Sequence, residues 1–252
     1  MLFEQIVYGP IHSRRLGMSL GMNIMPLHNK LCSFNCVYCE LGWNTEVANS
    51  TLPTPQQVSE TLKAKLSELT EPLDVITFSG NGEPTMHPDF KQIIEDTCLL
   101  RDTYCPQAKV SVLSNSTFLA RTSVVEGLKR ADNRILKLDS AVDKTMHLID
   151  QPVNKQLTVK QIENYLSSFS GDFTLQTCFL QGEMNGQMID NTTAEEVEAW
   201  YELVKRLKPK QIMMYVIDRQ TPLKTLKKIP RERMIKIAEP LQKDGFDIII
   251  SA

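Results

Sequence analysis

Apolar residues recur every three or four positions in three segments, each preceded by a helix-capping signal. The first segment begins at Thr54, which is followed by a proline and then by Gln57. This order is a capping box, and proline favours the first position of a helix. The apolar residues behind it fall on one helical face: Val58, Leu62, Leu66 and Leu69. The pattern recurs after Thr158 and Thr193, so we expect three amphipathic helices, the last ending before Pro209.

Short apolar runs lie between the helical segments and read as strands. They cover residues 74–79, 109–114, 134–139, 172–180 and 211–217, with an earlier one near 21–27 and a last one over 246–251. Strands that alternate with helices imply βαβ units and a parallel sheet. About six such units predict an α/β fold, either doubly wound or a curved partial barrel, and both bind ligands at the carboxyl ends of the strands.

The length and composition narrow the class of protein. A chain of 252 residues with 42% hydrophobic and 23% charged residues fits one domain with a large core, or at most two small ones. We expect one domain over 1–252, in which 1–30 lead into the first strand and 220–252 form a C-terminal extension. The net charge of −2 excludes a uniformly basic nucleic-acid coat.

No apolar run is long enough to span a membrane, and the first ten residues contain no signal-peptide core. We therefore expect a cytoplasmic protein without a membrane partner. In that compartment the six cysteines are expected to be reduced and available for catalysis or metal binding.

Three of the cysteines, Cys32, Cys36 and Cys39, fall within eight residues just after the first predicted strand. Three thiolates are one ligand short of a closed zinc site or a fully ligated iron–sulfur cluster. In a four-iron cluster, three ligands leave one iron open for a substrate or cofactor. The alternative is a zinc site with His28 or another residue as the fourth ligand, although the second close pair typical of zinc knuckles is absent from the sequence.

A glycine-rich turn follows the strand predicted over 74–79. It reads Gly80, Asn81, Gly82, Glu83 and Pro84. Glycines at a strand-to-helix turn allow the backbone to approach a ligand closely, and Glu83 adds a carboxylate. The alternative is a tight turn with no ligand.

The cysteine spacing, with Tyr38 before the last cysteine, resembles the C-x3-C-x-aromatic-C motif of the radical S-adenosylmethionine (radical SAM) superfamily. The resemblance implies that Cys32, Cys36 and Cys39 bind a [4Fe–4S] cluster whose open iron chelates S-adenosylmethionine (SAM). It further implies that Tyr38 packs near the adenine, that the protein is oxygen-sensitive, and that the fold is a partial (β/α)6 barrel with parallel strands and outer helices.

The turn at residues 80–84 is similar to the GGE motif of that superfamily, which holds the amino group of SAM. It departs from the motif because Asn81 replaces the second glycine of a G-G-E-P run. The resemblance also implies SAM contacts at the ends of later strands: Ser114, Asn115, Lys137, Asp139 and Tyr215. For Lys137 and Asp139, a solvated strand end is the alternative.

Further segments resemble one branch of the superfamily, related to the wyosine-base synthases that remodel a guanosine in transfer RNA. They include Y-G-P at residues 8–10, S-R-R-L-G at 13–17, the glycine after C-E-L at 39–42, and I-D-R at 217–219. The resemblance covers nearly the whole chain, but kinship of fold does not fix a substrate.

Several residues are candidates for substrate contacts: His12, Arg14, Arg15, Cys178 and Arg219. Arg14 and Arg15 suit a phosphate or carboxylate at the barrel mouth, or equally an ion pair with a neighbouring acid. Residues 201–236 contain eleven Lys or Arg against three Asp or Glu. This basic segment suits RNA phosphates, or it is a solvated helix face.

The chemistry implied by the resemblance is a one-electron cleavage of SAM. An external donor of the flavodoxin or ferredoxin type reduces the cluster, and the resulting 5′-deoxyadenosyl radical takes a hydrogen atom from the substrate. Three hypotheses follow: a radical SAM enzyme that acts on RNA or a nucleoside, one that acts on a polypeptide such as a glycyl-radical enzyme, and a non-enzymatic zinc-binding module.

Overall fold

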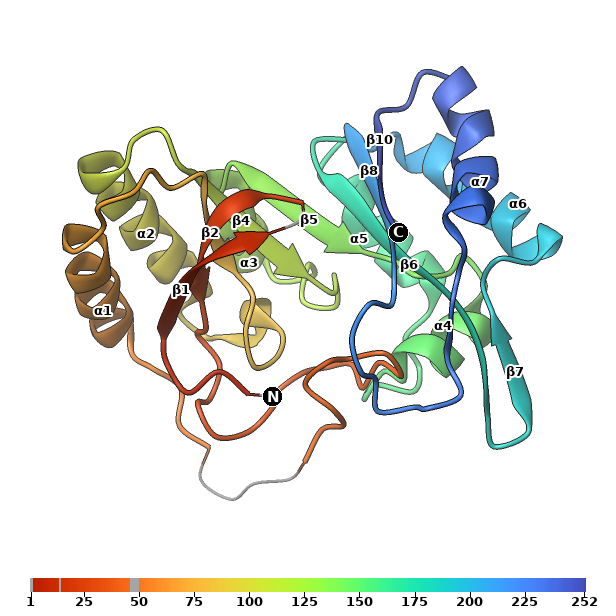
Figure 1. The fold of residues 1–252 in the computed structure, drawn as a ribbon, viewed down its shortest axis with the longest axis horizontal. Helices are drawn as coiled ribbons and strands as arrows, with labels where there is room; N and C mark the ends of the chain where they lie inside the picture. Colours follow the sequence, from red (N-terminus) through yellow and green to blue (C-terminus); the bar gives the residue numbers. More distant parts are fainter. Residues whose placement is uncertain (1, 14, 46–49) are drawn as a thin grey trace. The chain divides into compact units, whose positions relative to one another are not determined.

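The computed structural model describes residues 2–13, 15–45 and 50–252. The chain forms two compact units (Figure 1). Unit 1 consists of Met1–Ser33 and Asn44–Ile135, and unit 2 consists of Phe34–Trp43 and Leu136–Ala252. The boundary therefore falls inside the cysteine motif, with Cys32 in unit 1 and the other two cysteines in unit 2.

Unit 1 alternates strands and helices after an initial hairpin. Its elements are β1 (Val7–Ser13), β2 (Gly17–Met22), α1 (Pro55–Ser67), β3 (Val75–Phe78), the short 3-10 helix η1 (Pro84–Met86), α2 (Phe90–Tyr104), β4 (Lys109–Ser114) and α3 (Thr122–Arg130). The strand β5 (Asn133–Lys137) begins in unit 1 and ends in unit 2. Helix α2 packs against both α1 and α3.

The strands of unit 1 are parallel except at one edge. β2 pairs in parallel with β3, β3 pairs in parallel with β4, and β1 pairs antiparallel with β2. The first strand was expected near 21–27, which is wrong. The strand ends at Met22, because Asn23 bonds through its side chain to the backbone of Met25 and Asn81, so that the following apolar residues are buried without pairing.

Unit 2 continues the alternation. Its elements are α4 (Asp143–Asp150), α5 (Val159–Ser167), β6 (Thr174–Met184), β7 (Gln187–Asp190), α6 (Ala194–Leu207), β8 (Gln211–Val216), β9 (Lys227–Lys228), α7 (Arg231–Lys243) and β10 (Ile248–Ser251). β6 pairs in parallel with β8, and β8 with β10, while the far half of β6 pairs antiparallel with the short strands β7 and β9.

The predicted helix starts are confirmed, with one difference. Thr54 and Thr158 form complete capping boxes with the glutamines three residues later. Thr193 accepts a hydrogen bond from the Glu196 backbone, but the Glu196 carboxylate instead accepts one from Ser140 Oγ at 2.7 Å. The last box is therefore only half formed, because the buried Ser140 hydroxyl competes for the glutamate.

The predicted α/β fold with mostly parallel strands is confirmed in both units. In each unit the residues expected to contact SAM lie at or just after the carboxyl ends of strands, where α/β folds bind ligands. Within the described residues, no helix is both long and apolar enough to cross a membrane.

Candidate functional site

The backbone of Leu31 joins the cysteine motif to the glycine-rich turn of unit 1. Leu31 N–H donates to the Asn81 carbonyl at 2.8 Å, and Glu83 N–H donates to the Leu31 carbonyl at 3.1 Å. Gly82, at φ +152°, makes this approach feasible, because a Cβ there would lie 1.7 Å from the Leu31 carbonyl oxygen. Gly82 thereby brings the neighbouring Cys32 to the end of β3.

The Asn81 side chain holds the N-terminal segment. Its Oδ1 accepts from the Phe3 N–H at 2.8 Å, and its Nδ2 donates to the carbonyls of Phe3 and Pro26, each at 2.8 Å. The residue is fully buried. The Asn81 amide, which stands where the motif has a glycine, thus forms hydrogen bonds through both its oxygen and its nitrogen.

Glu83 connects the carboxyl ends of β3 and β4. Its Oε1 accepts from the backbone and hydroxyl of Thr85 and from Ser114 Oγ at 2.8 Å, and its Oε2 accepts from the Asn115 N–H at 2.6 Å. The carboxyl group is almost completely buried. Burial raises the pKa of Glu83 above its ordinary value, although the hydrogen bonds act to lower it.

Asn115 lies beside Cys32. Its Nδ2 lies 3.6 Å from Cys32 Sγ and 2.9 Å from Ser33 Oγ. Its Oδ1 accepts from the Thr117 N–H at 3.2 Å and from the Thr117 hydroxyl at 2.7 Å. Of the residues expected at the SAM site, unit 1 therefore brings Glu83, Ser114 and Asn115 together, with Asn115 beside Cys32.

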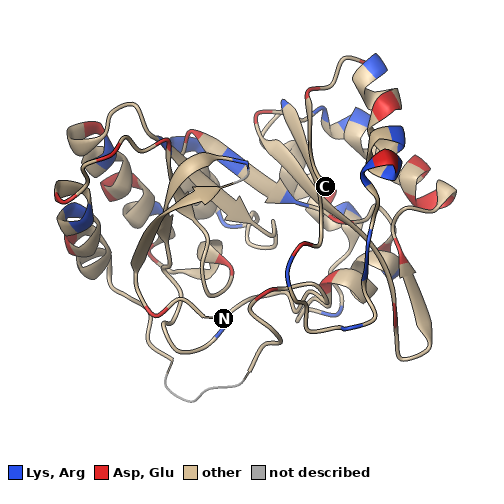
Figure 2. Cartoon of the chain, in the orientation of Figure 1, with Lys and Arg blue, Asp and Glu red and all other residues tan. Residues whose placement is uncertain are grey.

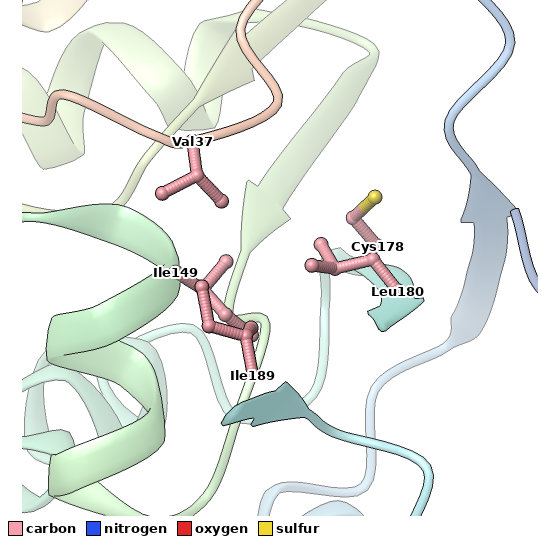
Figure 3. Close-up of a cluster of buried hydrophobic side chains, with 5 residues drawn as sticks. All are labelled: Val37, Ile149, Cys178, Leu180 and Ile189. Atoms are coloured by element: carbon pink, nitrogen blue, oxygen red, sulfur yellow. The ribbon is translucent and has the colours of Figure 1, made fainter. Parts of the chain in front are cut away.

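The other part of the cysteine motif is docked in unit 2. Val37 N–H donates to the carbonyl of Ile149, near the end of α4, at 2.9 Å. Figure 3 shows the Val37 side chain with four other buried residues: Ile149, Cys178, Leu180 and Ile189. Cys36 and Cys39 lie on either side of this anchor, in a turn closed by a Cys39 N–H to Cys36 carbonyl bond of 3.1 Å.

A buried charge cluster lies behind Cys36. Lys137 Nζ lies 3.0 Å from Asp139 Oδ2 and forms a closer ion pair with Asp150. The Cys36 thiol in turn donates to Asp150 Oδ1 at 3.5 Å. All three charged side chains are at least nine-tenths buried, so a solvated strand end is excluded for Lys137 and Asp139.

Burial and neighbouring charges shift the pKa values of Lys137 and Asp150 in this cluster. Burial acts to lower the pKa of Lys137, but the carboxylates of Asp139 and Asp150 outweigh it and raise that pKa well above its ordinary value. Burial raises the pKa of Asp150 to about 7 against the opposing effect of Lys137. The sequence did not indicate Asp150, because an aspartate in the last turn of a helix looks like an ordinary surface residue.

Tyr38 and Tyr215 extend the cluster. The Tyr38 hydroxyl donates to Asp139 Oδ2, and the Tyr215 hydroxyl donates to that of Tyr38 at 3.2 Å. Burial, and then the Asp139 charge, raise the pKa of Tyr38 well above its ordinary value, so the phenol stays protonated. Unit 2 thus brings together Tyr38, Lys137, Asp139 and Tyr215, all expected from the resemblance to lie near SAM.

Two of the candidate substrate residues lie in unit 2, where one is buried and the other is exposed. Cys178 is completely buried in the hydrophobic cluster of Figure 3, and burial raises its thiol pKa well above the ordinary value. Arg219 is exposed and forms an ion pair of 2.6 Å with Glu40, the residue after Cys39. Arg219 therefore lies at the surface of the cysteine motif.

The remaining candidates lie elsewhere. His12 is in β1 and Arg15 in the turn before β2, at the amino end of a strand whose carboxyl end faces the glycine-rich turn. This placement does not support a contact at the barrel mouth. Arg14 lies outside the described residues.

Two further observations concern other site types. A hollow of about 530 Å³ opens at the amino ends of β8 and β10, opposite to the ends that carry the candidate residues. Among the described residues, no group of three or more His, Cys, Asp or Glu side chains is close enough together to hold one metal ion. The thiolates of a four-iron cluster bind different irons, so they need not converge on one point.

Two curated relatives align with most of the chain. The GTPase Obg of Brachyspira hyodysenteriae is 31% identical over 236 residues, which are 91% of this chain but 32% of that protein. A UPF0026 protein of Synechocystis is 31% identical over 86% of this chain and 77% of its own length. The chain thus spans about a third of the Brachyspira relative, and its sequence contains no G-x4-G-K-[ST] phosphate-binding motif.

Two solved structures share the fold. Streptococcus suis SuiB bound to S-adenosylmethionine superposes with a TM-score of 0.65 at 14% identity, over 89% of this chain and 49% of SuiB. TYW1 with a lysine-pyruvate adduct bound gives 0.64 at 16% identity, over 90% of this chain and 73% of TYW1. These matches confirm the predicted fold, an α/β fold of the radical SAM type with outer helices.

Residues 27–204, more than half of the chain, match the Radical SAM superfamily. That span includes the cysteine motif, the glycine-rich turn and the buried charge cluster of unit 2. The chain therefore belongs to the radical SAM superfamily, a family of enzymes that implies a [4Fe–4S] cluster and S-adenosylmethionine as cofactors.

Proposed function

We propose that Cys32, Cys36 and Cys39 hold the [4Fe–4S] cluster of this enzyme. The observation that carries the proposal is the docking of the cysteine motif, at one end by Leu31 and at the other by Val37. All three cysteines are partly exposed and stand outside any disulfide, and three thiolates are a donor set that fits three irons of a cluster. The bound cluster supplies the electron that splits SAM into methionine and a 5′-deoxyadenosyl radical.

The residues around the motif support SAM binding in different ways. The side chains of Asn81 and Glu83 are engaged inside unit 1, so we propose that the turn from Gly80 to Pro84 offers its backbone to the amino group of SAM. In unit 2, the hydrogen-bonded Tyr38 and Asp139 give the adenosine a dry, pre-oriented wall. Arranging polar groups before the ligand arrives lowers the cost of binding.

Iron and sulfide analysis after anaerobic reconstitution tests the cluster assignment. Alanine at Cys32, Cys36 or Cys39 is expected to abolish uptake of the cluster. Cys105→Ala is the matched control, because Cys105 is also a partly exposed free thiol but follows α2. Full iron and sulfide content in any of the three variants would contradict the assignment.

We further propose RNA or a nucleoside as the substrate, on the basis of the basic segment. Figure 2 shows Lys and Arg on α6, α7 and the chain between β8 and α7. Within the described residues, five of the eleven basic side chains form neither an ion pair nor a hydrogen bond: Lys208, Lys224, Lys227, Arg231 and Lys236.

Two of these lysines lie in the segment that follows Leu223, which contacts the cysteine motif. Leu223 N–H donates to the Val37 carbonyl at 3.3 Å, and Lys224 and Lys227, further along the chain, are exposed. Cations at that place suit the phosphates of an RNA whose target base enters the site. Phosphate contacts of this kind give affinity without sequence preference.

The salt dependence of transfer RNA binding tests this proposal. Lys224→Gln with Lys227→Gln is expected to reduce the slope of log K against log salt by about 1.4–1.8, since each phosphate contact contributes about 0.7–0.9. Lys236→Gln, on α7, is the control and should change the slope less. Absence of measurable RNA binding would contradict the proposal and favour a polypeptide substrate.

A polypeptide substrate is the second candidate, because SuiB, which shares the fold, has been solved bound to its precursor peptide SuiA. For either substrate the enzyme needs an external electron donor, which we propose to be of the flavodoxin or ferredoxin type.

The six cysteines, all among the described residues, form no disulfide, which is consistent with the proposed cytoplasmic location, where thiols remain reduced. We also propose that residues 1–252 form one radical SAM domain.

A further inference from the structure

We propose that Asn115 is a positioning residue that donates an N–H to the Cys32 thiolate and thereby raises the reduction potential of the cluster. The proposal rests on the proposed function, since it takes Cys32 as a cluster ligand. It assigns Asn115 to the sulfur rather than to SAM. The observation is the 3.6 Å separation between Asn115 Nδ2 and Cys32 Sγ.

The orientation of the Asn115 amide follows from its other partners. The backbone N–H of Thr117 can only donate, and it lies 3.2 Å from Asn115 Oδ1. The Thr117 hydroxyl lies 2.7 Å from the same oxygen. An inverted amide would turn its own N–H groups against the Thr117 N–H, so the nitrogen must face Cys32 and Ser33.

The backbone of Asn115 is fixed as well. Its N–H donates to Glu83 Oε2 at 2.6 Å, and the buried Glu83 carboxyl is held by Thr85 and Ser114. Leu31, the neighbour of Cys32, is bonded on both sides to the turn that carries Glu83. The donor and the residue next to the sulfur are therefore both held by the same turn.

The effect on the cluster has a definite sign. Reduction adds negative charge to the cluster, and an N–H aimed at a ligand sulfur stabilises that charge. Hydrogen bonds to the sulfurs are among the factors that set the potential of iron–sulfur clusters. Removal of this donor should therefore lower the midpoint potential, while a carboxylate in its place should lower it further.

A redox titration of the reconstituted enzyme, followed by electron paramagnetic resonance, tests the proposal. Asn115→Leu keeps the size of the side chain and removes the donor, and Asn115→Asp replaces the donor with a carboxylate oxygen. We expect the midpoint potential to fall in the order wild type, Asn115→Leu, Asn115→Asp. In competition with a chelator, iron should be released from Asn115→Leu at about 10–100-fold lower chelator concentration.

Ser33→Ala is the matched control, because it removes the other acceptor of the same amide, at 2.9 Å, and leaves the contact with Cys32. Its potential should equal that of the wild type. Equal potentials in the wild type and both Asn115 variants, or an equal shift in Ser33→Ala, would overturn the proposal.

A measurement on the wild type alone covers the case in which the variants do not fold. Electron–nuclear double resonance of the reduced cluster should show a coupled proton that disappears after exchange into heavy water. The absence of an exchangeable coupling would refute the assignment of Asn115. Failure of the wild type to take up a cluster would instead overturn the proposed function, so the two failures are distinguishable.

Discussion

The buried lysine of unit 2 provides a quantitative test of the structure. Lys137 Nζ lies 3.0 Å from Asp139 Oδ2 and also pairs with Asp150, and all three side chains are excluded from water. At an effective dielectric constant of about 20, one such contact corresponds to roughly 5–6 kcal/mol of Coulomb energy. Most of that energy offsets the cost of desolvating the charges.

Lys137→Met leaves two buried carboxylates without a cation. Removal of one partner from a buried ion pair costs about 3–5 kcal/mol. We expect a value toward the lower end, because Asp150, whose pKa burial raises to about 7, can take up a proton when the lysine is absent. Addition of Asp150→Asn to the Lys137→Met variant should recover part of the loss.

Urea unfolding of the apoprotein, followed by circular dichroism, measures this loss as a change in the free energy of unfolding. The control is Lys91→Met, which removes an exposed ion pair with Glu126 at 2.8 Å and should cost no more than about 1 kcal/mol. A Lys137→Met variant that loses less than about 1 kcal/mol would refute the argument, because the buried cluster would then contribute no more than a surface pair.

Three further predictions concern local features. Gly82→Ala should cost about 3 kcal/mol or more in urea unfolding, because its Cβ would overlap a carbonyl oxygen, whereas Gly42→Ala, with no atom within 4 Å, should cost about 1 kcal/mol. Burial raises the pKa of Glu83 above 4.5, so the native state retains a proton that the unfolded state has released. Stability should therefore fall as the pH rises from 4.5 through the raised pKa, and Glu83→Gln should remove this slope; identical pH profiles would contradict it. Thr158→Ala should cost about 1 kcal/mol, because it removes the capping bond from the Gln161 N–H, and an unchanged free energy of unfolding would exclude that bond.

Local signals in the sequence predicted much of the fold. The capping residues Thr54 and Thr158 fix helix starts through bonds to residues three positions away, so the pattern is visible in a short window. The cysteine spacing is similarly local. The hairpin of β1 and β2 was not predicted, because it depends on Tyr8 packing over Gly21, where a Cβ would lie 2.1 Å from the ring.

Contacts between distant residues explain what the sequence did not reveal. Asp150 is 114 positions from Cys36, and Asn115 is 83 positions from Cys32, so neither pairing leaves a local pattern. The placement of Arg15 depends on the direction of β2 in its sheet, which the residues around it do not encode. Strand ends indicated where polar residues gather, but not which of them bind each other.

Formation of 5′-deoxyadenosine tests the central claim most directly. The wild type, reconstituted anaerobically with iron and sulfide and then given dithionite and SAM, should produce 5′-deoxyadenosine that is separable by chromatography. Cys36→Ala should produce none, and Cys105→Ala should produce as much as the wild type. Production by Cys36→Ala, or none by a wild type that carries the full cluster, would contradict the account.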